Sequence, residues 1–352
     1  MKRDQTKPLQ RTIVTAEPDN CETPIHDTQD FLTPKNLFYK RNHFPYPSHP
    51  SFSWPLIIEG KVKKKRSFSE SQLRAMPSRS LVTVMECAGN KRTSFSPKPK
   101  GLPWGDGAIS QGKWKGVSLS HLLKLTGIDS SVKEVIFQGA DQLNGVCYER
   151  SLPLDKALHR DTLIAYEMND DPIPFHHGYP YRVIVPDWYA MASVKWLTRI
   201  ILTDQVFTGP FQTDDYLYIP KPETNSKPIP VREKRVNTII QEPRHLDILS
   251  MGIHTIRGIA WSGTGMITRV EVSVDEGNRW EEAEFISHDH HPYAWKYWKW
   301  DWEISRQGIY NIWIRATDSS GRIQPEKPKW NQLGYGYNGY ANIQVTAVED
   351  QT

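Results

Sequence analysis

Residues 85–92, Met-Glu-Cys-Ala-Gly-Asn-Lys-Arg, say most about the fold and chemistry of this chain. The segment Ser80–Met85 before the cysteine is rich in β-branched residues and predicts a strand that ends at Glu86-Cys87. Two small residues and then two cations, Lys91 and Arg92, lie beyond Cys87, so a bulky group can approach the backbone and the thiolate form is favoured. A cysteine at a strand end is most often a buried structural residue, and the alternative is a functional thiolate.

The two other cysteines, Cys21 and Cys147, bring the total to three, and so low and odd a number argues against a disulfide framework. Neither the CxxC nor the HxxxH spacing of common metal sites occurs in the sequence. A functional thiolate at Cys87 therefore implies either a nucleophile or a metal whose other ligands come from a cofactor.

The 352 residues have the composition of an ordinary globular protein, with 38% hydrophobic and 24% charged residues. The formal net charge of +4 is a mild excess with both signs interspersed, so nucleic acid is not an expected partner. No stretch reaches the ~20 apolar residues of a membrane span, and the N-terminal segment has no signal peptide or twin-arginine leader. We therefore expect a cytoplasmic protein with no membrane span.

Residues 1–30 are polar and predict an N-terminal arm, whereas residues 31–228 mix predicted strands with a helix, which indicates an α+β domain. The helix is expected over Val117–Thr126, where the apolar spacing is helical and Gly127 ends it. Beyond Ser80–Met85, strands are expected over Val132–Gln138, Tyr181–Pro186 and Val194–Thr203.

Residues 219–230 are rich in proline and polar residues and predict an interdomain connection. Residues 229–352 predict an all-β, immunoglobulin-like sandwich, with strands over Ile253–Ile259, Met266–Val274, Trp280–Phe285, Trp295–Trp302 and Gly308–Thr317. Trp298, Trp300 and Trp302 fall on one face of their strand. We expect this aromatic surface to contribute to a homodimer, because a small solvated sandwich does not need it.

Several short motifs, in the same order along the chain, resemble those of the sulfite oxidase family of molybdenum enzymes. They are Phe38-Tyr-Lys-Arg-Asn-His43, Glu86-Cys-Ala-Gly-Asn-Lys-Arg92, Lys100-Gly-Leu-Pro-Trp104, Gly107-Ala-Ile-Ser110, Gly139-Ala-Asp141, His177-Gly-Tyr-Pro180 with Arg182, Met191-Ala-Ser-Val-Lys-Trp196, Arg315-Ala-Thr-Asp318 and Trp330-Asn331. The resemblance extends from Glu22 to Tyr340. It implies a molybdopterin-binding catalytic domain over residues 31–228, a dimerisation domain over 229–352, and oxidation of sulfite by oxygen-atom transfer.

The resemblance also implies a cofactor site, in which a pterin dithiolene and the Cys87 thiolate hold the molybdenum. The residues that would surround the pterin and its phosphate are Arg41, Asn42, His43, Asp141, His177, Arg182, Ser193, Val194 and Lys195. The chemistry of these residue types agrees, because Arg182 and Lys195 can form charge-assisted bonds with the phosphate and Asp141 can accept from ring N–H groups.

A small oxyanion such as sulfite needs a cationic pocket. By the same resemblance, Arg41 and Arg92 would contact the anion, and Lys100 and Trp104 would shape the pocket. Tyr216 would be a hydrogen-bond donor near the reactive oxo group.

One departure from the family pattern bears on the substrate. Family members that oxidise sulfite efficiently tend to carry an arginine where this chain has Leu333. A reductase of a sulfoxide or N-oxide on the same cofactor is therefore an alternative, since a neutral substrate needs less positive charge. A second alternative is a non-catalytic binding protein built on the sandwich, with Cys87 merely buried.

Two further expectations concern redox partners and metals. The haem domain of some animal members has no counterpart before Asn36, so we expect no haem and a separate electron acceptor such as a cytochrome. The cluster His288, His290 and His291 is expected to lie in a loop between strands, and surface metal binding is its less favoured interpretation.

Overall fold

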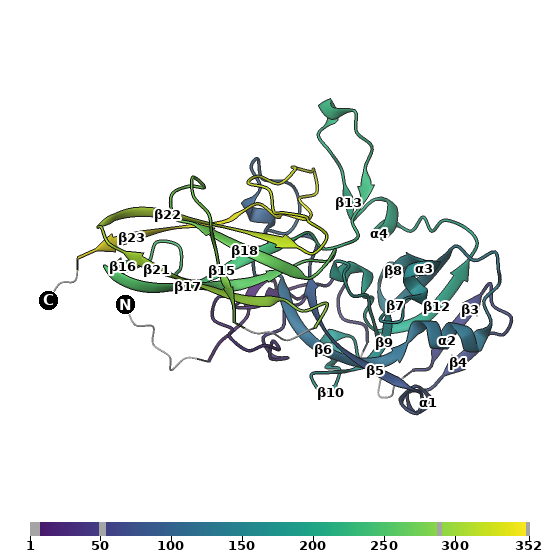
Figure 1. Ribbon diagram of the computed structural model, residues 1–352. Helices are drawn as coiled ribbons and strands as arrows, with labels where there is room; N and C mark the ends of the chain where they lie inside the picture. Colours follow the sequence, from purple (N-terminus) through teal and green to yellow (C-terminus); the bar gives the residue numbers. More distant parts are fainter. Residues whose placement is uncertain (1–7, 49–53, 287–290, 350–352) are drawn as a thin grey trace.

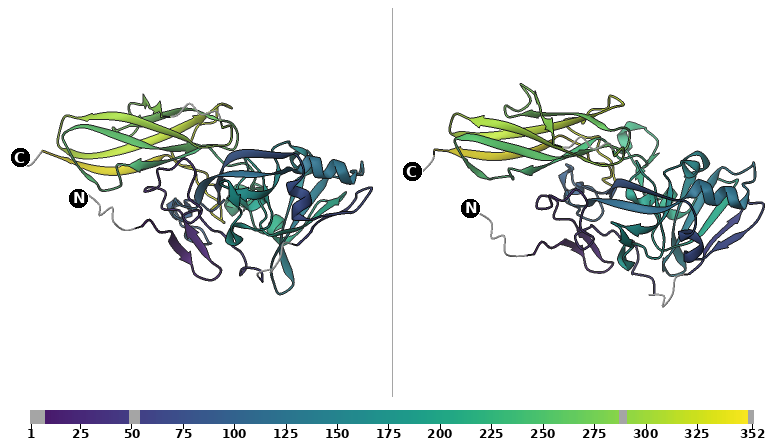
Figure 2. Two further views of the ribbon diagram at one scale, coloured as in Figure 1. Left: turned by 90° about the horizontal axis from the view of Figure 1, so that it is seen from below. Right: turned by 60° about the horizontal axis from the view of Figure 1, so that its bottom comes forward.

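The computed structural model describes residues 8–48, 54–286 and 291–349. Within this range a mixed α+β part comes first, and a β-sandwich lies beside it (Figure 1). Two further views show the same division, with the sandwich strands running lengthwise away from the mixed part (Figure 2). The predicted fold class, an α+β domain followed by a sandwich, is therefore confirmed.

Two sheets form the frame of the mixed part. The first has the strand order β10-β9-β6-β5, with β11 also pairing β9, and the second has the order β4-β3-β12-β7-β8. The first consists of β5 (Ser78–Glu86), β6 (Ile109–Ser118), β9 (Leu163–Met168), β10 (Asp171–Pro172) and β11 (Arg182–Ile184). The second consists of β3 (Leu56–Gly60), β4 (Arg66–Phe68), β7 (Glu134–Leu143), β8 (Val146–Pro153) and β12 (Leu197–Thr203). Because β5 pairs with β6 as far as Glu86, the sheet fixes the residue that precedes Cys87.

The helices of this part are short. They are α1 (Glu70–Arg74), α2 (Leu119–Thr126), α3 (Leu154–Leu158) and α4 (Pro210–Thr213), with 3-10 turns η1 (Arg92–Ser94), η2 (Phe175–His177), η3 (Ala190–Ala192) and η4 (Pro222–Thr224). Helix α2 buries Leu119, Leu122 and Leu123 in the main apolar core, and each such burial stabilises the fold by roughly 1.5–3 kcal/mol. Gly127, at a φ of 71°, ends the helix as predicted. Val117 and Ser118 belong instead to β6, which the sequence did not predict.

The sandwich has two sheets, ordered β15-β17-β21-β20 and β16-β23-β22-β18-β19. Its strands are β15 (Asn237–Glu242), β16 (Ile248–Ser250), β17 (Gly252–Trp261), β18 (Ile267–Ser273), β19 (Glu281–Glu282), β20 (Glu284–Phe285), β21 (Lys296–Ile304), β22 (Gly308–Asp318) and β23 (Ala341–Val348). The segment predicted as one strand over Trp280–Phe285 is two, because the chain passes there from one sheet to the other.

The tryptophans of β21 do share one face, but that face is the inside of the sandwich. Trp298 is 0% and Trp302 5% exposed, and Trp300 packs against the same cluster. The expectation that this strand offers aromatic surface to a partner is therefore wrong. The two sheets close over the indole rings, and the rings fill the core of the sandwich.

The sandwich packs against the mixed part through an apolar cluster to which both contribute side chains. It consists of Ile25, Val84, Ile109, Ile239, Ile259, Trp261 and Trp295. The strand that precedes Cys87 thus contacts the sandwich directly, through Val84.

Two segments that were predicted as irregular contain strands. The N-terminal arm includes a hairpin of β1 (Thr12–Thr15) and β2 (Asn20–Glu22), and the connection at 219–230 includes β14 (Ile229–Pro230), which pairs with β13 (Leu217–Tyr218). The second hairpin projects from the molecule (Figure 1). None of the helices in the described part of the chain has the length and apolar character needed to cross a membrane.

Candidate active site

Cys87 directly follows β5 and lies on the wall of a cavity. Its backbone N–H donates to Ala108 O at 2.9 Å, and its Sγ accepts from the Gly89 N–H at 3.4 Å. Burial raises the pKa of the thiol, while the Arg41 and Arg92 cations oppose that rise. Lys91, which the sequence suggested as a charge beside the sulfur, instead donates from Nζ to Asn237 and Thr238 in the sandwich.

The cavity brings together most of the residues predicted to hold a cofactor. Those on its wall are Arg41, Asn42, His43, Cys87, Asp141, His177, Arg182, Ser193 and Lys195. Val194 is the exception, because its side chain is buried in the main apolar core. Its backbone carbonyl accepts from Val183 N, in β11, at 2.9 Å. Tyr148 also lines the cavity and was not predicted, since it stands in an ordinary strand without a motif.

Positive charge dominates the cavity end that is formed by Arg182 and Lys195. Burial lowers the pKa of Arg182 to about 10 and that of Lys195 to about 7, even though Asp141 acts in the opposite direction on Lys195. Within the described chain, Nε of Arg182 and Oδ1 of Asp141 are buried without a hydrogen-bond partner. Buried cations and orphaned polar atoms of this kind are costly unless a ligand pairs with them.

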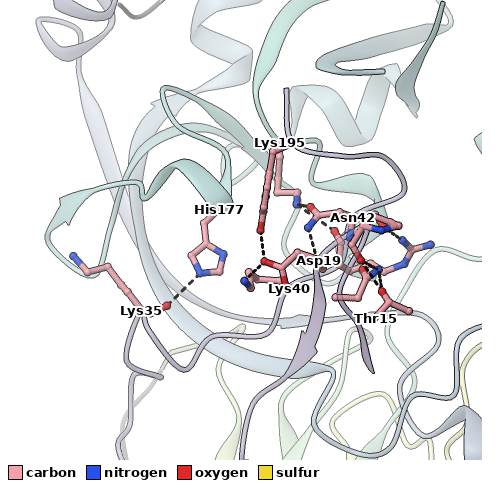
Figure 3. A network of polar contacts seen from close by, with 11 residues as sticks. Thr15, Asp19, Lys35, Lys40, Asn42, His177 and Lys195 are labelled. Carbon is pink, nitrogen blue, oxygen red and sulfur yellow. Dashed lines mark hydrogen bonds and ion pairs between the residues drawn. The ribbon is translucent and has the colours of Figure 1, made fainter. Parts of the chain in front are cut away.

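The N-terminal hairpin bonds to Asn42, one of the residues that line the cavity (Figure 3). Asn42 donates from its backbone N–H to Asn20 Oδ1 at 2.7 Å and from Nδ2 to Asp19 O at 2.6 Å, and its Oδ1 accepts from Lys195. Lys40 forms an ion pair with Asp19. The segment predicted as an arm therefore supports Asn42, which accepts from Lys195 on the cavity wall.

A second pocket shares Arg41, His43, Cys87 and Tyr216 with the first. Its remaining lining residues are Arg92, Lys100, Gly101, Leu102, Trp104, Asp215, Leu333 and Tyr335. All six residues predicted as catalytic thus meet here, and Cys87 lies where the two pockets join. Asp215, Leu333 and Tyr335 join them from segments far apart in the sequence.

Arg92 is held rigidly in this pocket. Its Nε donates to Leu333 O at 3.0 Å, its Nη1 donates to Leu102 O at 2.9 Å, and its guanidinium lies over the Tyr335 ring at 5.0 Å. A Cβ at Gly89 would lie 2.8 Å from its Nη2, and one at Gly101 would lie 3.0 Å from its Cζ. A side chain at either position would therefore make the guanidinium move from its present place.

Tyr216 has a backbone conformation that bulky residues rarely adopt, with a φ of 57°. This conformation brings its hydroxyl 2.7 Å from Nε2 of His43. Burial and the Arg41 cation hold the pKa of His43 well below its usual range, so the ring is neutral. Arg150, which the sequence did not indicate, lies with its guanidinium 5.3 Å from the Tyr216 ring.

No group of three or more His, Cys, Asp or Glu side chains in the described ranges is placed to hold a metal ion. His288 and His290 of the predicted histidine cluster lie outside the described residues.

Comparison with known proteins agrees with this geometry. The oxidoreductase molybdopterin binding domain model matches residues 43–211, and the Mo-co oxidoreductase dimerisation domain model matches residues 229–348. The chain is 34% identical to sulfite oxidase of Gallus gallus, over 92% of this chain and 75% of that protein. The chain belongs to the sulfite oxidase family.

Other proteins that resemble this chain have different activities in their names. The mitochondrial sulfite oxidase of Drosophila melanogaster is 36% identical over 94% of this chain, which spans only 62% of that protein. A nitrate reductase of Cichorium intybus is 32% identical over 97% of this chain and 41% of that protein. The sulfane dehydrogenase SoxCD of Paracoccus pantotrophus superposes with a TM-score of 0.84 at 26% identity, covering 97% of this chain and 90% of that chain.

The residues that line the cavity fit a bound molybdopterin, the group that the name of the matched domain specifies. The cavity offers a single thiolate, at Cys87, and two buried cations, Arg182 and Lys195, of which Arg182 has an Nε without a partner that a phosphate could bind. Asp141 has a free acceptor for a pterin N–H group. Gly178, at a φ of 108°, lets Lys195 lie against the backbone, since a Cβ there would be 3.0 Å from the Lys195 Cβ.

Proposed function

We propose that this chain oxidises sulfite to sulfate at a molybdenum held by molybdopterin and by the Cys87 thiolate. The observation that carries the proposal is the position of Cys87, at the junction of a deep cationic cavity and a second pocket that contains Arg41 and Arg92. One pocket suits a pterin phosphate, and the other suits a small oxyanion.

Each residue has a role that its surroundings support. Arg182 and Lys195 would pair with the phosphate, and Asp141 would accept from the pterin ring. When bound, the molybdenum group supplies the transferable oxygen and accepts two electrons. Arg41 and Arg92 would bind and orient sulfite, and the Tyr216 hydroxyl would donate to the reacting oxygen. Overall, sulfite and water give sulfate, two protons and two electrons.

The electrons would pass one at a time to a separate acceptor, for which a cytochrome is our candidate. Metal analysis of the purified protein should find one molybdenum per chain. Steady-state oxidation of sulfite with cytochrome c, ferricyanide or oxygen should then show turnover with at least one acceptor. A protein that contains molybdenum but does not oxidise sulfite with any of them would contradict the proposed substrate.

A second candidate function is reduction of a neutral oxo-substrate, such as a sulfoxide or N-oxide, on the same cofactor. Leu333 favours it, because this apolar side chain lines the pocket at the position where efficient sulfite oxidisers tend to carry an arginine. Reduction of methionine sulfoxide by the loaded protein, with reduced viologen dye as the electron donor, would distinguish the two candidates. A protein without molybdenum would leave only a binding role.

We also infer a homodimer through the sandwich, which is supported by the match to a dimerisation domain. Ile248 of β16 and Ile309 of β22 flank Thr346 of β23, so both lie on one outer face, where they are 72% and 67% exposed. Replacing both isoleucines with lysine should shift sedimentation from dimer to monomer, and a wild-type monomer at micromolar concentration would overturn the inference. The cytoplasmic location stays a prediction, and several relatives are named as mitochondrial.

A further inference from the structure

The residues on either side of Cys87 make polar contacts with the sandwich. We call residues 86–92 the cysteine loop. Glu86 is 1% exposed, and its Oε2 accepts from Nε1 of Trp261 in β17 at 2.8 Å. Its other carboxylate oxygen accepts from Asn90 Nδ2 at 3.1 Å, which ties the two ends of the turn together. The carboxylate of Glu86 thus bonds both to the sandwich, at Trp261, and to the other end of the cysteine loop, at Asn90.

Lys91 makes the second connection. Its backbone φ of 59° is in the left-handed region. Its side chain points toward the sandwich. The ammonium donates to Asn237 Oδ1 at 2.8 Å and to Thr238 O at 2.7 Å, and it lies 5.6 Å from the Trp261 ring. Asn237 and Thr238 belong to β15 and are both fully buried. Lys91 and Glu86 therefore reach adjacent strands of one sheet.

The backbone of the loop is bound from the same side. Gly336, in the segment between β22 and β23, donates its N–H to Ala88 O at 2.8 Å. Ala88 is the residue next to Cys87, so contacts with the sandwich domain reach both neighbours of the metal ligand.

These bonds do more than hold two domains together. The apolar cluster around Val84, Ile239 and Trp261 already supplies an interface at the same place. Apolar contacts are non-directional, whereas hydrogen bonds to charged groups fix direction and register. Burying a carboxylate and an ammonium is costly unless both are well bonded, and the loop contains both.

We propose that Glu86, Lys91 and Trp261 form a clamp through which the β-sandwich fixes the position of the Cys87 sulfur. The sandwich would then be part of the metal site as well as a dimerisation unit. The link between the clamp and molybdenum rests on the proposed function, in which Cys87 is the metal ligand. The effect of the clamp on the cysteine loop itself does not.

Hydrogen–deuterium exchange of the full chain tests the clamp without relying on activity. Trp261→Phe removes one N–H donor and keeps an aromatic ring, and Lys91→Met removes the ammonium at nearly constant length. Each should raise exchange of the amides in residues 87–92 by about tenfold or more, the effect of losing a buried bond to a charged group. Trp54→Phe is the matched control, since it removes an indole donor that ends on Leu197 O, in the mixed part, at 2.8 Å. It should leave exchange in the loop within about twofold of wild type.

Unchanged exchange in both clamp variants would overturn the proposal, as would an equal rise in Trp54→Phe. In the molybdenum-loaded protein, Trp261→Phe should also alter the electron paramagnetic resonance spectrum of the reduced metal, and Lys91→Arg should restore the wild-type spectrum that Lys91→Met loses. A raised exchange rate together with absent molybdenum would preserve the clamp and contradict the proposed function instead.

Discussion

The hydroxyl of Tyr216 lies 2.7 Å from Nε2 of His43, and both residues line both of the pockets that share Cys87. The two residues are far apart in the chain, and the left-handed backbone of Tyr216 is what brings them together. The Arg41 guanidinium contacts the same imidazole, with Nη2 3.1 Å from Nδ1. The proposed oxyanion ligand Arg41 and the proposed donor Tyr216 are therefore linked through one neutral ring.

Tyr216→Phe should lower kcat for sulfite by roughly a hundredfold, the usual loss for a donor aimed at a reacting oxygen. The variant also leaves Nε2 of His43 without its partner. Tyr189→Phe is the control, since Tyr189 is buried in the same cluster and its hydroxyl accepts from Arg235 N. If Tyr216→Phe kept wild-type kcat in steady-state assays, Tyr216 would have no role as a donor.

Cys87→Ser should abolish turnover while leaving the fold intact, because a hydroxyl is a harder and more basic ligand than a thiolate. Molybdopterin content should fall only in part, since the contacts proposed for the phosphate remain. Cys147→Ser, a change at a half-buried cysteine in β8, should keep full activity. Activity and metal content of both variants check this, and an active Cys87→Ser protein would remove the sulfur from the mechanism.

Arg92→Gln should raise KM for sulfite by about ten- to a hundredfold, since one charge-assisted bond to the anion contributes roughly 1.5–3 kcal/mol. The structure adds a cost in stability, because Leu333 O and Leu102 O would lose their donor. The melting temperature of the variant should therefore be measured alongside its kinetics, and we expect it to be lower than that of the wild type. An unchanged KM at both low and high ionic strength would mean that the anion binds elsewhere.

Leu333→Arg should lower KM for sulfite if the pocket lacks one cation at this place. The gain should be smaller than the loss in Arg92→Gln, since a new arginine must be desolvated and has no rigid support. Leu333→Met keeps the volume and apolar character and should leave KM within about twofold. If arginine and methionine had the same effect, charge at this position would not limit sulfite binding, and the reductase candidate would gain support.

Lys195 makes the stability of the cofactor-free protein depend on pH. Burial, with Arg182 and Arg41 nearby, lowers its pKa from 10.5 to about 7. Between these values the unfolded chain holds more protons than the folded one, so stability rises with pH, by at most about 1.4 kcal/mol per pH unit. Urea unfolding at pH 7 and pH 9 should show this rise relative to Lys195→Met. A difference between the two proteins that does not change with pH would mean that Lys195 is charged in the fold.

The strands and the glycine-stopped helix were predictable because their patterns are local. Leu119, Leu122 and Leu123 have helical spacing in the sequence and share the buried face of α2. The same local reasoning identified the face of β21 that carries Trp298, but it did not reveal whether that face met solvent or a second sheet. Burial depends on which strands lie opposite, and the sequence pattern of one strand does not contain that information.

The candidate site was predictable where motifs mark it and not elsewhere. Arg41, Cys87 and Lys195 stand in recognisable motifs, and all three lie on one cavity. Arg150 and Tyr335 do not stand in such motifs. From the sequence alone, a single arginine in a strand cannot be distinguished from one that forms a structural ion pair. Their proximity to Tyr216 arises from how β8 and the segment before β23 pack.

The glycines around Arg92 also determine where this pocket can be redesigned. Gly89 and Gly101 face the guanidinium, and Gly334, at a φ of 61°, would place a Cβ 2.9 Å from the Arg92 Cγ. A larger residue at Gly89 or Gly101 would make the guanidinium shift, and one at Gly334 would also meet Pro99, with its Cβ 2.3 Å from the Pro99 Cγ, so substitutions there should weaken the placement of Arg92. Leu333 accepts from Arg92 through its backbone carbonyl, so this bond does not depend on its side chain, which packs at the edge of the cluster that contains Tyr216 and Tyr335. A library confined to this position is the shortest route to an altered substrate range.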